Sequence, residues 1–191
     1  MMLSLFLPCL VKAHPHVYVV NRFTLIFDDQ GLTGVRVHWV FDKFFSSMIL
    51  EEFAPNSRET LAPAEITAIE KGAFSHLANH DYFLHMKIDG HPFKVREIRD
   101  FTAAKRDGAL IYEFTVLCRV PPAKRPRQVH IAPYDPSFYS YILFAEDNPV
   151  RIQNGDKYDA TVKVEKNPEA AYFHGQVQPY EMILQFGLKN G

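Results

Sequence analysis

Cysteine is scarce in this chain of 191 residues, which contains only Cys9 and Cys118. Cys9 falls within an N-terminal segment that we expect to be removed during export. The processed chain would then hold Cys118 alone, so no intramolecular disulfide could form even in an oxidising compartment. Cys118 itself lies in an alternating apolar run, which favours a buried core residue over a reactive thiol.

The chain also lacks an excess of charge of either sign. Its 21 lysine and arginine residues nearly balance its 22 aspartate and glutamate residues, and the formal net charge is −1 at pH 7. The basic cluster Lys124–Arg127 is interrupted by Pro126 and is typical of a solvated loop. A balanced charge gives no electrostatic support to polyanion binding, so we expect no nucleic-acid partner.

The apolar run near the N-terminus is too short to cross a bilayer, which needs about 20 residues. This run, Met2–Val11, has the length of the hydrophobic part of a secretory signal. Val11-Lys12-Ala13 supplies small or modest residues at the positions that precede signal cleavage, although no lysine or arginine precedes the run. We therefore expect residues 1–13 to be a signal peptide and residues 14–191 to be a single periplasmic domain without a transmembrane segment.

Alternation of apolar and polar residues predicts β-strands along most of the chain. The clearest hairpin joins His16–Phe27 to Leu32–Phe41 through a turn at Asp28–Gly31. Further strands are expected at Tyr82–Ile88 and His91–Arg99, which flank an Asp-Gly turn, and at Ala109–Val120, Gln128–Pro133, Phe138–Ala145, Val150–Gln153 and Tyr158–Lys166. The last twenty-five residues show too little pattern to be placed.

Two helices are expected after the first hairpin. The segment Asp42–Phe53 has apolar residues at helical spacing, and Asp42 is well placed to cap its N-terminus. The segment Leu61–His80 has the stronger pattern, with Pro63 in its first turn and an apolar stripe along one face. The fold class is therefore α+β, a mostly antiparallel β-rich body with two helices inserted after the first hairpin.

The candidate chemistry lies in the nine histidines, an elevated number for this length. His14 and His16 stand at the predicted start of the processed chain, and four more histidines fall within residues 76–91. Imidazole is a good ligand for zinc, nickel, cobalt and copper ions. We therefore expect one of these divalent transition-metal ions as the cofactor.

The first candidate site is the predicted N-terminus. If His14 is the first residue, its α-amino group and ring nitrogen can chelate one ion together, and His16 projects to the same side of an extended chain. Pro15 has no backbone N–H, which blocks the square-planar arrangement that copper and nickel form with backbone amides. The alternative interpretation is that these residues merely begin a strand.

Asp42 and His38 are candidate neighbours of this first site. Pairing the first hairpin about Asp29-Gln30 sets Val17 opposite Asp42, which brings the carboxylate to the end where the processed chain begins. A role as helix N-cap explains Asp42 equally well without a metal.

The second candidate site is the pair His76 and His80, four residues apart on the predicted helix. Two histidines at this spacing can offer ligands to one metal ion, and Asp81, close in sequence to His85, could add an oxygen ligand. No glutamate stands between the pair, so the usual metalloprotease pattern is absent. The alternative is that both are core or edge histidines satisfied by hydrogen bonds.

Four short segments give the chain a resemblance to a known family. They are His14–Val19, Trp39–Ser46, Asn79–Phe83 and Tyr134–Tyr139, and they occur in the family's order over most of the chain. The sequence resembles domain-of-unknown-function family 1007, exported bacterial proteins often described as the periplasmic component of an uncharacterised ABC-type transport system. The resemblance implies export and a neighbourhood of nickel, cobalt or other transition-metal permeases. The acidic, calcium-loop-like stretch that the family often carries is missing at Pro55–Thr60.

One expected function and two alternatives follow. We expect an exported, non-enzymatic protein that binds zinc, nickel, cobalt or copper and serves a membrane metal transporter or permease. One alternative is an accessory module of an ABC-type transport system that binds a protein partner and no metal. The other is a copper redox enzyme with an N-terminal histidine chelate, although no nucleophile-elbow, zinc-protease or phosphate-loop pattern supports catalysis.

Overall fold

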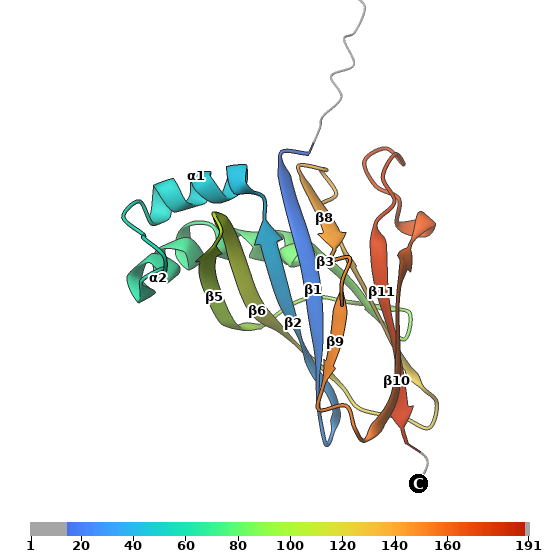
Figure 1. Ribbon diagram of the computed structural model, residues 1–191. Helices are drawn as coiled ribbons and strands as arrows, with labels where there is room; N and C mark the ends of the chain where they lie inside the picture. The colour runs from blue at the N-terminus through green and yellow to red at the C-terminus, as the bar shows by residue number, and fades with distance from the viewer. Residues whose placement is uncertain (1–14, 190–191) are drawn as a thin grey trace, which may run out of the picture.

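Two β-sheets whose apolar faces meet form most of the computed structural model, which describes residues 15–189 (Figure 1). The strands of the first sheet are β1 (Val17–Asp28), β2 (Gly31–Phe41), β5 (Ile98–Arg106), β6 (Ala109–Val120), β8 (Ser140–Phe144) and β9 (Val150–Gln153). Their order is β5-β6-β2-β1-β8, and β9 pairs with β1 farther along that strand. β1 runs parallel to β8 and β9, whereas the other pairs in this sheet are antiparallel.

The second sheet is antiparallel throughout. Its strands are β3 (Leu84–Ile88), β4 (His91–Phe93), β7 (Arg127–Pro133), β10 (Tyr158–Lys166) and β11 (Tyr180–Leu188). They lie in the order β10-β11-β7-β3-β4. Two connections therefore carry the chain from one sheet to the other between β4 and β7, because β5 and β6 belong to the first sheet.

The helices gather at one end of the molecule, beside the end of β2 (Figure 1). They are α1 (Lys43–Phe53), α2 (Pro63–Gly72) and the 3₁₀ segment η1 (Phe74–Phe83), and a short 3₁₀ turn, η2 (Pro168–Ala170), precedes β11. Within residues 15–189, no helix is both long enough and apolar enough to cross a membrane.

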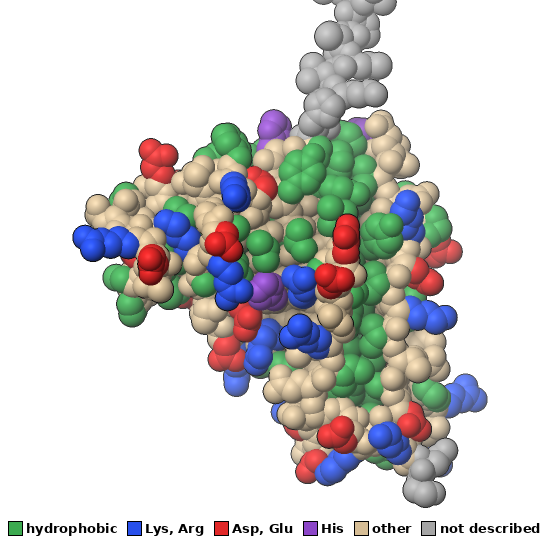
Figure 2. Space-filling view, in the orientation of Figure 1, with side chains coloured by type: hydrophobic (Ala, Val, Ile, Leu, Met, Phe, Trp, Pro, Cys, Tyr) green, Lys and Arg blue, Asp and Glu red, His purple; other side chains and the backbone are tan. Residues whose placement is uncertain are grey.

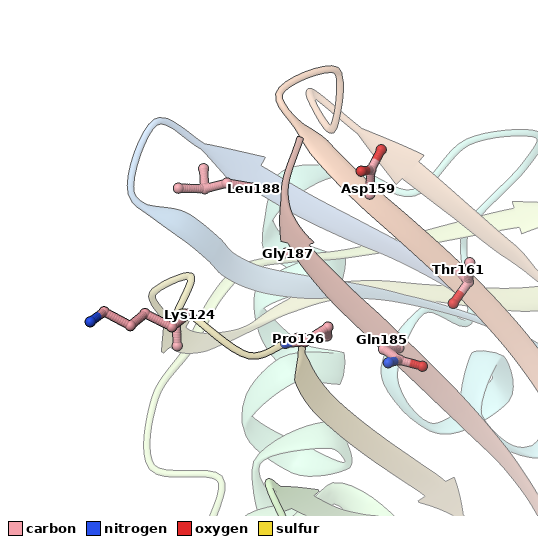
Figure 3. Close-up of a pocket in the computed structure, with 8 residues that line it drawn as sticks. Lys124, Pro126, Asp159, Thr161, Gln185, Gly187 and Leu188 are labelled. Atoms are coloured by element: carbon pink, nitrogen blue, oxygen red, sulfur yellow. The ribbon is translucent and has the colours of Figure 1, made fainter. Parts of the chain in front are cut away.

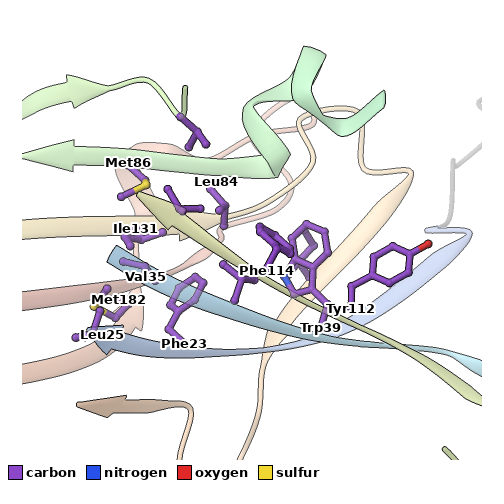
Figure 4. Packing of buried hydrophobic residues seen from close by; sticks show 14 of the residues in the cluster. Phe23, Leu25, Val35, Trp39, Leu84, Met86, Tyr112, Phe114, Ile131 and Met182 are labelled. Carbon is purple, nitrogen blue, oxygen red and sulfur yellow. The ribbon is translucent and has the colours of Figure 1, made fainter. Parts of the chain in front are cut away.

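The core lies between the two sheets because the inward residues of both are apolar. Figure 4 shows Phe23, Trp39 and Phe114 of the first sheet packed near Ile131 and Met182 of the second. Each of these side chains is at most 1% exposed. Burial of apolar surface, worth about 25 cal/mol per Å², is therefore the main force that holds the sheets together.

The α+β class, the first hairpin and the capped helix are confirmed, but the hairpin register differs by one residue from the prediction. A register shift between Ile26 and Phe27 places one extra residue in β2, so Val19 pairs with Phe41. Asp42 therefore lies beside Tyr18, one position away from the predicted neighbour Val17. The sequence marks the turn at Asp28–Gly31 clearly, but it gives no comparable signal for a bulge of this kind.

The predicted helix Leu61–His80 is wrong in its second half, because α2 ends at Gly72. Gly72 packs so closely on Phe53 of α1 that a Cβ atom there would lie 2.1 Å from the ring. Phe74 then turns into the core, where its ring stacks on Phe101 with centroids 4.1 Å apart. The chain continues as a 3₁₀ segment because these contacts outweigh continuation of the α-helix.

Two expectations about strands also need correction. The predicted strand His91–Arg99 is divided, because β4 ends at Phe93 and the chain then crosses to the first sheet to form β5. The last twenty-five residues contain β11, which lies between β10 and β7. Its core-facing residues are Met182, Leu184 and Phe186.

Ser46 attaches α1 to the first sheet, and its replacement tests the strength of this attachment. Its fully buried hydroxyl accepts the Leu110 N–H at 2.8 Å and donates to the Asp42 carbonyl oxygen at 2.6 Å. Replacement Ser46→Ala leaves the Leu110 N–H without this acceptor, so we expect the free energy of unfolding to fall by about 1–3 kcal/mol in urea denaturation. Ser47→Ala, on the exposed side of the same helix, is the matched control and should cost less than about 0.5 kcal/mol. Equal losses in the two variants would contradict this role of Ser46.

Candidate functional site

His16 stands immediately before β1, with its side chain exposed. Its backbone N–H donates to the Tyr139 carbonyl oxygen at 2.8 Å, and the two rings lie 5.0 Å apart between centroids. Its predicted partner His14 lies outside the described residues. Figure 2 shows histidine side chains and an apolar surface at this end of the molecule. The structure therefore anchors the His16 backbone while its ring faces solvent.

Asp42 uses both oxygens of its carboxylate to hold backbone groups. Oδ1 accepts the Phe45 N–H at 2.9 Å, which caps α1, and Oδ2 accepts the Tyr18 N–H at 2.8 Å, which fixes the start of β1. The carboxylate thus holds a residue that follows His16 by two positions, so it lies at the end of the molecule where the processed chain is predicted to begin. Its N-cap role is confirmed, and any metal at Asp42 would have to share oxygens that already accept these two hydrogen bonds.

His38 lies on the outer face of the first sheet, away from the predicted N-terminal site. Asp42 is four positions farther along the chain, which is roughly 13 Å along an extended strand. Its cross-strand neighbours are Arg22 and Glu113. Burial lowers the pKa of His38, and its Nδ1 atom is buried without a hydrogen-bond partner in the described part of the chain. The structure does not bring His38 to His16.

His76 and His80 do not form the predicted pair on one helical face. Both lie in η1 and are exposed, and His80 has a non-helical backbone with φ −120°. In a 3₁₀ helix of three residues per turn, positions four apart point about 120° away from each other. The predicted spacing therefore fails because the α-helix ends at Gly72. Asp81, with φ 48°, begins a left-handed turn that directs the chain into β3.

Asp81 instead lies near His85, in a groove of about 550 Å³ on the outer face of the second sheet. The His85 ring stacks on Tyr134 with centroids 3.8 Å apart, and its Nε2 atom lies 3.1 Å from the Tyr134 carbonyl oxygen. Burial lowers the pKa of His85, an effect that the carbonyl and the Asp81 carboxylate oppose. Asp81 Oδ1 is buried without a hydrogen-bond partner among the described residues.

A second histidine of this surface was missed in the sequence. His130 Nδ1 lies 3.1 Å from Glu181 Oε2, and Glu181 is only 7% exposed. Glu181 also lines the groove that contains His85. The pair was missed because Glu181 belongs to β11, a strand that the sequence analysis did not place.

Another groove of similar size lies elsewhere and has no histidine in its lining. It measures about 580 Å³ and is an open groove beside β10 and β11 (Figure 3). Lys124 and Asp159 are its charged lining residues. Over residues 15–189, no group of three or more histidine, cysteine, aspartate or glutamate side chains is arranged to hold a metal ion.

The four sequence segments that carry the family resemblance are neighbours in space. Tyr139 accepts the His16 N–H, and Asp42 accepts the Tyr18 N–H, which joins three of the segments. The fourth joins them through Tyr134, whose N–H donates to the Phe83 carbonyl oxygen at 3.0 Å. The segments therefore build one end of the molecule.

Comparison with known proteins gives a family match and relatives without an assigned activity. A family described as protein of unknown function, DUF1007, matches residues 1–178. A Spirochaeta aurantia protein, described as an uncharacterised 15.5 kDa protein in the trpE 3′ region, is 28% identical over 116 residues, which cover 60% of this chain and 81% of the relative. An uncharacterised Haemophilus influenzae protein is 22% identical over 193 aligned residues, covering 100% of this chain and 89% of the relative.

The lowered pKa of His85 predicts a pH dependence of stability. The unfolded chain takes up a proton at this residue near its ordinary pKa of 6.5, whereas the folded chain resists protonation. The folded state with neutral His85 is therefore fully favoured above pH 6.5, and this contribution to the free energy of unfolding is lost as the pH falls below that value. We expect the free energy of unfolding, measured by urea denaturation, to fall between about pH 7.5 and about pH 5.5 more steeply for the wild type than for His85→Gln.

His91→Gln is the control for this measurement, because His91 is exposed on β4. It should retain the pH dependence of the wild type. If His85→Gln also retains that dependence, burial of His85 does not contribute to it.

Proposed function

The chain belongs to the DUF1007 family, and on this basis we propose that it is an exported periplasmic protein that binds one divalent transition-metal ion and serves a membrane metal transporter. The proposed ligands begin with His14 and His16, at the predicted start of the processed chain. Zinc, nickel, cobalt and copper are the ions that suit such nitrogen donors.

The observation that carries this proposal is the anchored, exposed position of His16. The Tyr139 carbonyl holds the His16 N–H, and the Asp42 carboxylate holds the Tyr18 N–H two residues later. These two hydrogen bonds fix the backbone directly after the predicted processing site. A donor that is already held in place loses less conformational freedom when it binds, which favours metal affinity.

The number of donors suits a protein that delivers its metal to another. The α-amino group and ring of His14 with the ring of His16 would supply three nitrogen ligands. A tetrahedral ion then keeps one open position for water or for a ligand from a partner. A transporter could occupy that position first and replace the protein donors afterwards, so a terminal site favours transfer of the ion over permanent storage.

A second candidate function, a protein-interaction module that binds no metal, is favoured by the apolar surface at the same end of the molecule (Figure 2). Tyr18 is 48% exposed, Tyr139 54% and Phe44, in the first turn of α1, 71%. Exposed aromatic side chains are enriched in protein–protein interfaces. In this alternative the same end of the molecule contacts the transporter without a metal ion.

Export predicts a defined N-terminus for the processed protein. When the full chain is expressed in a bacterium, we expect the periplasmic fraction to contain protein that begins at His14, because Ala13 precedes the predicted cleavage site. N-terminal sequencing measures this directly. Protein that keeps Met1 and stays in the cytosol would contradict both the localisation and the terminal chelate.

Metal binding predicts that one added residue before His14 weakens affinity. The processed protein should bind about one zinc, nickel, cobalt or copper ion in calorimetric titration, more weakly below about pH 6.5, where imidazole is protonated. An alanine added before His14 turns the α-amine into an amide, a poor ligand, and should weaken binding about tenfold or more. The side chains of the chain are unchanged, so the loss reports on the amine.

The matched control for this experiment is His76→Ala with His80→Ala. Both rings are exposed, so the double variant should fold, as checked by circular dichroism, and should bind like the wild type. Equal affinity of the extended and processed chains would exclude the terminal chelate. No heat with any of the four ions would favour the interaction module.

A further inference from the structure

A small cavity lies between the first sheet and the helical segments α1 and η1, near the start of β1. It measures about 80 Å³ and is lined by eleven residues of β1, β2, β6, β8, α1 and the α2–η1 region. No lining residue is charged at neutral pH, and the walls are largely aromatic and aliphatic. The cavity is therefore suited to an uncharged molecule and is separate from the proposed metal site.

Tyr112 lines this cavity and carries a buried polar atom without a partner among residues 15–189. Its side chain is 2% exposed, and its hydroxyl is buried without a hydrogen-bond partner in the described part of the chain. Figure 4 shows the hydroxyl directed away from the packed core, toward the beginning of β1. Edge contacts with Phe41 and Phe101, at centroid distances of 4.8 and 5.3 Å, hold the ring. Burial raises the pKa of Tyr112, so the hydroxyl stays protonated and can donate.

The other polar groups of the wall leave this donor without an acceptor. The Trp39 indole N–H is a donor only, and it already donates to Asn21 Oδ1 at 3.0 Å. Ser140 is the remaining lining residue with a polar side chain, and the Tyr112 hydroxyl makes no hydrogen bond with it. A buried water usually needs two to four polar partners, and cavities with apolar walls tend to stay dry. An unpaired buried hydroxyl is unfavourable, which favours a ligand that brings its own acceptor.

We infer that this cavity binds a small, uncharged, mainly apolar molecule with one hydrogen-bond acceptor, such as a carbonyl oxygen, which accepts the Tyr112 hydroxyl. The apolar part of the ligand contacts the surrounding aliphatic and aromatic walls. The volume is about half the ~150 Å³ of an engineered cavity that takes up benzene, so it suits about four non-hydrogen atoms. Tyr112 supplies the specificity, and the walls supply the hydrophobic contact.

Acetone and isobutene test this inference because they have the same shape, and only acetone carries an acceptor. Each is titrated into the folded protein, into the millimolar range, while the methyl NMR signals of Val19, Leu77 and Ile142 are followed, since all three line the cavity. We expect both probes to shift these signals in a saturable way. In Tyr112→Phe, acetone should bind about tenfold more weakly, and isobutene should change less than about twofold.

Two variants make the result decisive. Tyr112→Phe keeps the ring and removes an unpaired hydroxyl, so it should fold at least as well as the wild type. Ala73→Leu adds side-chain volume at the cavity wall and should abolish the shifts from both probes. The inference is wrong if neither probe shifts the lining signals of the wild type, as a cavity filled by tightly held water would predict. It is equally wrong if Tyr112→Phe weakens both probes alike or leaves acetone binding unchanged.

Discussion

The carboxylate of Asp42 joins the end of β2, the first turn of α1 and the start of β1. Its two oxygens accept backbone N–H groups from Phe45 and Tyr18, while its own N–H donates to the Tyr18 carbonyl at 2.9 Å. Ser46 extends the junction to β6 through the Leu110 N–H. Helix α1, the backbone hydrogen bond of His16 and the small cavity all lie around this junction. The geometry of the end of the molecule that carries His16 therefore depends on it.

Acidic and serine side chains, which are common catalytic groups in enzymes, hold the backbone in place in this fold. Asp135 is 4% exposed and accepts hydrogen bonds from the Ser137 N–H, the Ser137 hydroxyl and the Ser140 N–H. It shapes the turn whose last residue, Tyr139, anchors His16. Acidic and hydroxyl groups such as Asp42, Ser46 and Asp135 thus position the chain, whereas the His16 side chain is exposed and Asp81 Oδ1 lacks a partner among the described residues.

Sequence patterns predicted the elements whose signal is local. The Asp28–Gly31 turn and the Asp42 cap are examples, because neighbouring residues determine both. The break at Gly72 depends on Phe53, a contact between two helices, and the pattern of the segment alone favoured a longer helix. The alternation of Met182, Leu184 and Phe186 was a usable strand signal that passed unrecognised. Missing that strand also hid Glu181 and its pairing with His130.

The placement of the histidines is the reason for proposing the metal site at the processed N-terminus rather than within the fold. His38 and His85 both have lowered pKa values and are good neutral donors, but they lie on the outer faces of different sheets. The packed core separates those faces, and stacked sheets are already about 10 Å apart. A single ion therefore cannot use both rings. At the proposed processed N-terminus, by contrast, His14 would provide an amine beside an imidazole, so the proposed chelate would need no second element of the fold to bring its ligands together.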